Sequence, residues 1–217
     1  MTITHHLDDA TLVAYASGTL GEAHSVVVAA HAALCPACRA AIRMAESLGG
    51  LALEDIDESG VSDTCRAATL ASLDGVARAA KPAQPPLRGE VPAPLCTLID
   101  SRPLADLKWK SKGHGIAKID LPVTAGSRTR LHLLRIAAGK ALPEHGHGGE
   151  ELTLILKGSY SDHTGRYGAG DVADLGEDIE HAPRVDPEGE CICLVATEAP
   201  TRFKSIWARL AQPFVGI

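Results

Sequence analysis

The sequence is poor in aromatic residues and has no long apolar run. Only 3% of its 217 residues are aromatic, so packed cores have to use Leu, Val, Ile and Ala, for which an apolar content of 45% is sufficient. No stretch approaches the roughly 20 apolar residues that a membrane span needs. The N-terminus also lacks the basic start and apolar segment of a signal peptide. We therefore expect no membrane association and a cytoplasmic location, where the six cysteines serve as metal ligands or free thiols.

Basic residues are scarce in the first third of the chain. Residues 1–80 contain four basic and ten acidic side chains, a net charge of 4 − 10 = −6, whereas the rest of the chain holds 17 of each sign. An acidic segment repels phosphate backbones, so we expect no direct DNA binding there. It suits a basic protein partner instead.

Residues 1–80 have the pattern of a helical domain. The expected helices run from Asp8 or Asp9 to Ser17, over 21–34, from Pro36 to about Leu48, and from Ser62 or Asp63 to about Ala80. Gly49 and Gly50 are expected to stop the third helix, and the acidic residues 54–58 to form a loop. Residues 81–94 contain five prolines and predict an extended linker at a domain boundary.

After the linker the chain changes to short apolar or alternating runs separated by glycine and proline. Such runs cover 116–121, 128–136, 151–156 and 191–196. The pattern predicts a small antiparallel barrel or sandwich over residues 95–217.

A first group of metal-ligand residues lies in the helical part. His31 and Cys35 are four residues apart and share one helix face, and Cys35 and Cys38 have the Cys-x2-Cys spacing that lets two thiolates bind one tetrahedral ion. His5 or His6 can supply a fourth ligand from the N-terminal end, and we favour His6. The alternatives are a buried histidine beside two inert thiols, or a redox Cys-x2-Cys pair, which normally follows a strand.

The spacing His6-x24-His31-x3-Cys35-x2-Cys38 resembles the zinc-binding anti-sigma factor family. Residues 1–6, residues 15–20 and the two-part architecture resemble its ChrR branch, which has a C-terminal cupin domain. The resemblance implies two domains: an all-α zinc-binding bundle over 1–80, and an all-β cupin (a double-stranded β-helix or jelly-roll barrel) over 95–217. It further implies inhibition of an extracytoplasmic-function (group IV) sigma factor, and its release under singlet oxygen or related oxidants.

A second group fits the cupin boxes. The run Gly139-x5-His145-x-His147-x3-Glu151-x6-Gly158 matches the first box at every spacing, and the two histidines point to one side of a strand. Spacing favours Glu151 over Glu150. The second box keeps His181 but replaces its proline, second glycine and asparagine with Gly176, Asp178 and Val185. His145, His147, Glu151 and His181 therefore predict a site for zinc or another divalent transition metal.

The remaining cysteines and histidines carry less information. Cys191 and Cys193 lie on one face of a strand; one reading has them line the metal cavity, and the reading we favour makes them small apolar core residues. His24, His114, His132 and His163 are read as ordinary surface or packed histidines. The alternative function is a cupin-type metalloenzyme, such as a dioxygenase, hydrolase or isomerase, with an accessory zinc domain. The sequence shows no added acid/base group beside the metal residues, which favours a regulator over an enzyme.

Overall fold

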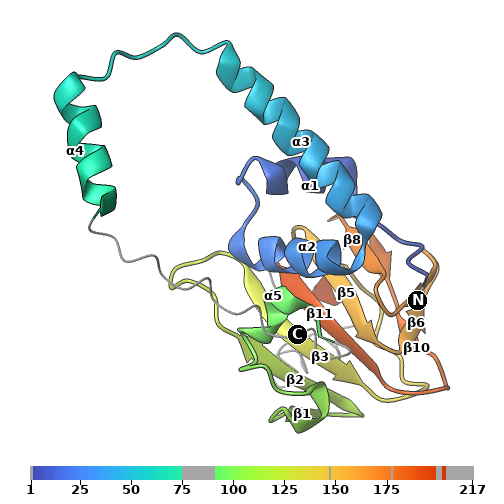
Figure 1. Ribbon diagram of the computed structural model, residues 1–217. Helices are drawn as coiled ribbons and strands as arrows, with labels where there is room; N and C mark the ends of the chain where they lie inside the picture. The colour runs from blue at the N-terminus through green and yellow to red at the C-terminus, as the bar shows by residue number, and fades with distance from the viewer. Residues whose placement is uncertain (1, 75–90, 147, 177, 199–201, 204–217) are drawn as a thin grey trace.

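The computed structural model describes residues 2–74, 91–146, 148–176, 178–198 and 202–203. Helices gather in the N-terminal part and strands in the C-terminal part, as expected from the change of pattern along the chain (Figure 1).

The N-terminal helices are α1 (Asp9–Ala16), α2 (Glu22–Leu34), α3 (Pro36–Glu54) and α4 (Asp63–Asp74). The carboxylate of Asp8 caps α1 by accepting a hydrogen bond from the backbone N–H of Thr11 at 2.6 Å. The Ser62 hydroxyl caps α4 in the same way, by accepting a hydrogen bond from the backbone N–H of Cys65 at 3.2 Å. The predicted starts of these helices are therefore confirmed, and the predicted end of α4 at about Ala80 lies outside the described residues.

The predicted end of the third helix is wrong. Helix α3 continues through Gly49 and Gly50 to Glu54. A glycine stops a helix when it adopts a positive φ, and neither of these glycines does. Each costs about 1 kcal/mol of helix propensity, and the good helix formers that follow, Leu51 to Glu54, offset part of that cost. The predicted loop at 54–58 therefore begins one residue late, at Asp55.

The end of the predicted linker is packed rather than extended. Val91 is buried, and the short helix α5 (Ala93–Cys96) begins within the segment expected to be linker. Proline is tolerated here because it stands in the first turn of α5, where the backbone N–H has no helical partner. Residues 81–90 lie outside the described residues.

The C-terminal part is a barrel of antiparallel strands preceded by the 3-10 turn η1 (Leu104–Asp106). Its largest sheet has the order β1-β2-β3-β11-β5-β8, and the two smaller sheets have the orders β10-β6-β7 and β12-β4-β9. The strands of the large sheet are β1 (Lys110–Gly113), β2 (Ile116–Leu121), β3 (Arg130–Ile136), β11 (Cys191–Thr197), β5 (Glu151–Lys157) and β8 (Val172–Leu175). The others are β4 (His145–Gly146), β6 (Ser159–Ser161), β7 (Arg166–Gly168), β9 (Glu180–His181), β10 (Arg184–Val185) and β12 (Arg202–Phe203). All four predicted strand runs are confirmed within two residues.

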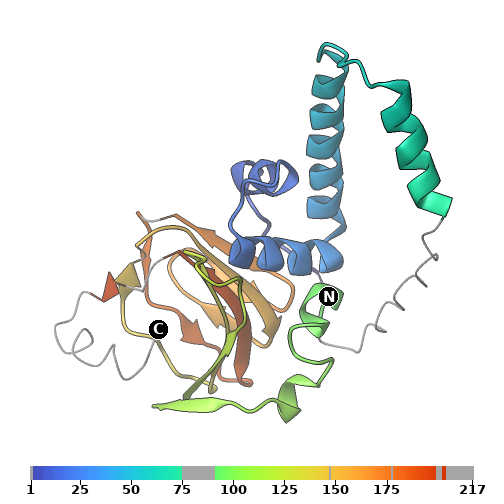
Figure 2. The same ribbon diagram turned by 90° about the vertical axis from the view of Figure 1, so that its left-hand side faces the viewer.

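The large sheet has two different faces because side chains alternate along a strand. On the outer face Leu133, Leu194 and Leu154 pair across β3, β11 and β5, and belong to the same buried cluster as Val27 and Val28 of α2. The inner face lines the barrel. Helix α2 thus lies directly on the sheet, so the N-terminal helices and the barrel share one core, as the two views in Figures 1 and 2 show.

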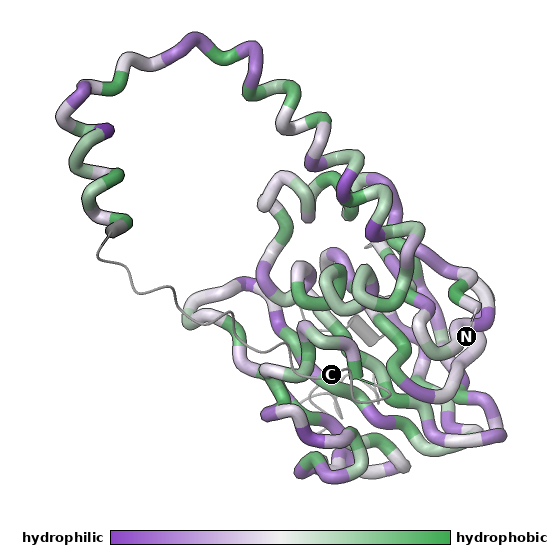
Figure 3. The backbone as a smooth tube through the Cα atoms, viewed as in Figure 1, coloured by the Kyte–Doolittle hydropathy of each residue, from purple (hydrophilic) through white to green (hydrophobic). Residues whose placement is uncertain are grey.

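Helix α3 begins in this core, with Cys38 and Ile42 buried, and its later part and α4 lie outside it. Figure 2 shows α3 projecting away from the barrel, with α4 beside it and clear of the sheets. Apolar side chains more than half exposed lie on both helices and on the segment that joins them: Met44, Leu48, Leu51, Leu53, Ile56, Val61, Leu70 and Leu73. Figure 3 shows the corresponding hydrophobic stretches along this part of the chain.

No single described helix is long and apolar enough to cross a membrane. Only together do helices α2 and α3 have the length and apolar composition of a membrane span, and the chain bends by 119° between them.

Candidate metal centres

The corner between α2 and α3 brings four predicted ligands together. The ligand atoms of His6, His31, Cys35 and Cys38 all lie within 4.8 Å of one another. The Sγ of Cys35 is 3.3 Å from Nδ1 of His6, and the Sγ of Cys38 is 3.2 Å from Nε2 of His31. A tetrahedral zinc ion with bonds of about 2.0–2.3 Å separates its ligand atoms by about 3.3–3.8 Å. The donor set and its spacing therefore fit a four-coordinate metal ion.

Local sequence explains the corner. Cys35 ends α2 and caps α3, with an extended backbone (φ −101°, ψ 109°), and Pro36 opens α3 where its missing N–H is harmless. The Cys35 N–H donates to the carbonyl of His31, and the Cys38 N–H donates to the Sγ of Cys35. These bonds hold both thiols on the same side as His31.

The structure separates the two candidate N-terminal histidines. The ring of His6 faces the thiols, and its Nδ1 is also 3.6 Å from the Sγ of Cys38. The ring of His5 points elsewhere, packing at 4.2 Å from the Tyr167 ring and lying 3.4 Å from the carboxylate of Asp171. Of the two alternatives, the geometry thus places His6 in the cluster.

Burial sets the protonation of this cluster. Desolvation lowers the pKa of His31 to about 4, so its imidazole is neutral at pH 7, the form that binds metals. Desolvation, together with the neighbouring Cys35, raises the pKa of Cys38 to about 11. Without a bound cation the thiolate form of Cys38 is therefore disfavoured, and a metal ion would stabilise it.

The barrel supplies contacts that orient the cluster. The Nδ1 of His31 lies 3.0 Å from the carbonyl oxygen of Gly170, which directs Nε2 toward the thiols. Asp171 accepts hydrogen bonds from the N–H groups of Thr4 and His5 at 2.7 and 3.0 Å, just before His6. Burial alone would raise the pKa of Asp171, but the N–H groups of Gly168, Thr4 and His5 outweigh that effect and lower it.

A cavity of about 60 Å³ occupies the barrel interior and contains most of the second predicted group. His145, Glu151 and His181 line it and are buried, whereas Glu150 is exposed. His145 pairs with His181 between β4 and β9, with ring centroids 4.6 Å apart. His147 lies outside the described residues.

Both described histidines of this group are oriented through Nδ1, the arrangement typical of metal-binding imidazoles. The Nδ1 of His145 is 2.8 Å from the carbonyl oxygen of Pro143, and that of His181 is 2.7 Å from the buried carboxylate of Asp162. Desolvation would raise the pKa of Asp162, but hydrogen bonds from Thr164 and His181 outweigh it and lower the pKa. Nε2 is then the atom with which each ring would bind a metal.

Sequence reasoning missed several residues of this cavity. Asp162 gave no signal, because only the fold brings it to His181, 19 residues away. His132 is not an ordinary packed histidine, since it lines the cavity together with Lys118, Arg130 and Tyr160. The alternation of side chains along a strand could have predicted this position, because His132 and Leu134 are two residues apart on β3 and therefore point to the same side, into the barrel. Cys193 also lines the cavity, with its Sγ 3.5 Å from that of Cys191, and both are buried as expected.

The fold defines a class of protein in which a helical module with a four-residue His/Cys cluster is joined to an antiparallel barrel whose cavity holds a second group of possible metal ligands. Residues 102–200 match the family described as the ChrR cupin-like domain. The whole chain is 42% identical over 219 residues to the anti-sigma-E factor ChrR of Cereibacter sphaeroides, with 100% of both chains covered. It also matches the crystal structure of Rhodobacter sphaeroides SigE in complex with the anti-sigma ChrR, at a TM-score of 0.76 and 39% identity, covering 90% of this chain and 99% of that one.

The chain belongs to the ChrR family of anti-sigma factors. This membership confirms the predicted family and the predicted fold of N-terminal helices followed by a cupin domain. It also agrees with the expectation of a regulator rather than an enzyme, since the full-length relative is an anti-sigma factor.

Proposed function

We propose that this protein is an anti-sigma factor that binds and inhibits an extracytoplasmic-function sigma factor through its helical region, residues 1–80, which precedes the cupin at 95–217. The observation that carries the proposal is the apolar surface of α3 and α4. Met44, Leu48 and Leu51 recur at helical spacing along one face of α3 and are each more than half exposed. Apolar side chains gathered in this way mark a protein-binding surface.

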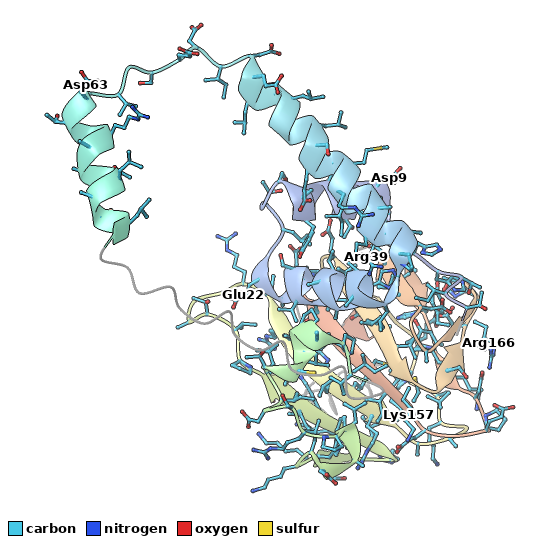
Figure 4. All side chains as sticks on the ribbon, in the orientation of Figure 1. Asp9, Glu22, Arg39, Asp63, Lys157 and Arg166 are labelled. Carbon is cyan, nitrogen blue, oxygen red and sulfur yellow. The ribbon has the colours of Figure 1, made fainter. Side chains whose placement is uncertain are left out.

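The surroundings of this surface suit a sigma factor. Figure 4 shows the side chains of α3 and α4 extending into open space, with Asp63 marking the start of α4. The acidic net charge of residues 1–80 complements a basic partner. The relative of known structure was solved with SigE. A sigma factor acts with RNA polymerase, so this function would place the protein in the cytoplasm.

Zinc is the metal we propose for His6, His31, Cys35 and Cys38. Two thiols and two imidazoles whose ligand atoms lie within 4.8 Å of one another suit it, and it would tie the N-terminal segment to the α2–α3 corner. Holding that corner fixes the direction in which α3 leaves the barrel. The metal would thus act by shaping the binding surface.

For the cupin we propose a second divalent transition metal, zinc among the candidates, held by His145, His147, Glu151 and His181. The cupin would be the part of the protein that responds to an oxidant such as singlet oxygen, with release of the sigma factor as the result. Imidazole and thiol side chains in and beside the cavity are chemically suited to oxidation, Cys193 being one of them.

The test is co-purification of the full-length protein with an extracytoplasmic-function sigma factor from the same organism. We expect a stable one-to-one complex, and a loss of affinity of at least about tenfold for Leu48→Glu, because a charge then has to be buried in an apolar interface. Ser111→Glu, on the exposed edge strand β1, is the matched control and should bind normally. Unchanged binding by Leu48→Glu would contradict this interface, and two bound metals without any sigma complex would favour an enzyme.

A further inference from the structure

The barrel cavity has two chemically different parts. Polar residues gather where β3, β11 and β5 present Arg130, His132, Thr197, Glu151 and Thr153. The other part is apolar and is lined by Leu134, Ile136, Leu142, Pro183, Val185 and Val195. A cavity with a polar end and an apolar end suits a small amphipathic molecule.

Two polar side chains in this cavity have no hydrogen-bond partner among the residues that the structure describes. His132 and Tyr160 are each 4% exposed. Neither ring nitrogen of His132, nor the hydroxyl of Tyr160, has a hydrogen-bond partner within the described part of the chain. An unsatisfied buried polar group costs about 1–3 kcal/mol, and most native structures avoid it. Two such groups around one cavity indicate a molecule that supplies the missing bonds.

The two groups lie on different walls. His132 is on β3 of the large sheet, where it pairs with Asp120 and Val195. Tyr160 is on β6 of a smaller sheet, where it pairs with Val185 and Tyr167. A ligand between them would be held from two sides.

The charge of the lining favours an anion. Lys118 is a buried lysine on the inner face of β2, and Arg130 also lines the cavity. Glu151 is the acidic residue among the lining side chains of the described chain. The Nζ of Lys118 is 3.1 Å from Asp120, whose side chain is 66% exposed, so a ligand carboxylate in the cavity would compete with Asp120 for this ammonium group. Burial, with Lys118 nearby, lowers the pKa of His132 to about 4, so at neutral pH this ring is uncharged and can donate one hydrogen bond.

We propose that this cavity binds a small monocarboxylate with a short aliphatic chain. Lys118 and His132 hold the carboxylate, the Tyr160 hydroxyl donates to it, and the chain lies against Leu134, Leu142 and Val185. The cavity volume of about 60 Å³ limits the ligand to a few carbon atoms. This site goes beyond the proposed sigma binding and does not depend on it.

Sodium butyrate is the probe, titrated into the full-length, metal-loaded protein by calorimetry. We expect saturable one-to-one binding, and at least tenfold weaker binding of the uncharged isostere butanamide, since one charge-assisted contact contributes about 1.5–3 kcal/mol. Lys118→Met should weaken butyrate binding at least about tenfold. Tyr160→Phe, which removes a single hydroxyl and keeps the ring, should weaken it by about three- to tenfold. Lys108→Met, at an exposed lysine, is the control and should bind butyrate normally.

Two results would overturn the proposal. One is the absence of butyrate binding by the folded, metal-loaded protein. The other is butyrate affinity that is unchanged in both Lys118→Met and Tyr160→Phe, and is lost when the metal is removed with a chelator, because the carboxylate would then bind the metal alone. Metal content and circular dichroism of each variant separate a lost ligand site from a lost fold. Sigma-factor binding, measured on the same samples, reports on the other function independently.

Discussion

The Nδ1 atom of His31 lies 3.0 Å from the carbonyl oxygen of Gly170, across a sequence separation of 139 residues. A predicted ligand of the helical metal centre is therefore oriented by the turn before β8 of the barrel. One residue further on, Asp171 binds the backbone that leads into His6. The barrel thus touches the metal centre from two sides, which gives a direct path between the two halves of the protein.

The first prediction concerns this path. Asp171→Ala removes the acceptor for three backbone N–H groups, those of Thr4, His5 and Gly168. We expect a loss of about 1–3 kcal/mol in unfolding free energy. We also expect about 10–100-fold weaker zinc binding at the helical centre, measured by chelator competition. Asp57→Ala, at an exposed carboxylate between α3 and α4, is the control. Equal zinc affinity in the two variants would show that the barrel does not position this centre.

The second prediction concerns the thiols. Cys38→Ser should lower the metal content by one ion per chain and abolish sigma binding, because α3 is then no longer fixed at its corner. Elemental analysis and co-purification measure both effects. Cys65→Ser is the matched control for metal content, since Cys65 is exposed and lies outside the cluster. Ser111→Glu on β1, away from α3 and α4, is the control for sigma binding. Sigma binding by a Cys38→Ser protein that has lost this metal would refute the structural role of zinc.

A third prediction separates the two centres. Asp162→Asn weakens the acceptor that orients His181 through a 2.7 Å contact. We expect about 10–100-fold lower metal affinity in the barrel, with the helical centre unchanged. Sigma binding should persist and release by singlet oxygen should be impaired. If the variant responds to the oxidant as the natural protein does, the barrel metal is not needed for the response.

The fourth prediction is a pH dependence. The hydroxyl of Ser159 and the guanidinium of Arg166 lower the pKa of Asp186, against a smaller opposing effect of burial. Because the folded state then binds fewer protons than the unfolded state, the stabilisation is present above about pH 4 and is lost as the pH falls through the lowered pKa.

Asp186→Asn should therefore cost about 1–2 kcal/mol of unfolding free energy at pH 7, measured by denaturant titration. The difference from the natural protein should shrink as the pH falls below about 4, where Asp186 of the unfolded chain becomes protonated, and disappear below the lowered pKa of the folded state. Asp57→Asn, at an exposed position between α3 and α4, should show neither effect. A difference that stays constant with pH would mean that the lost interaction is not electrostatic.

The sequence predicts those structural features that depend on residues close together in the chain. The His31–Cys35–Cys38 corner follows from helix periodicity and Pro36, and the inward phase of the strands from their alternation. Gly49 and Gly50 misled the prediction because a glycine stops a helix only in the left-handed conformation, which sequence does not specify. The contacts of Gly170 with His31 and of Asp162 with His181 could not be predicted, because they depend on how the strands fold together. The interior position of His132 could have been predicted from the alternation of side chains along β3.

The exposed apolar surface of α3 and α4 has a consequence for protein turnover. The part of α3 after Ile42 and all of α4 lie outside the shared core, and side chains such as Leu48 and Leu70 are more than half exposed. A segment with few buried contacts opens readily, and proteases cleave opened segments. A partner that covers α3 and α4 would protect them, so chains without a partner should be degraded faster than chains in a complex. The abundance of the regulator would then follow that of its partner, and the cell would hold little unbound inhibitor even if the two proteins were made in unequal amounts.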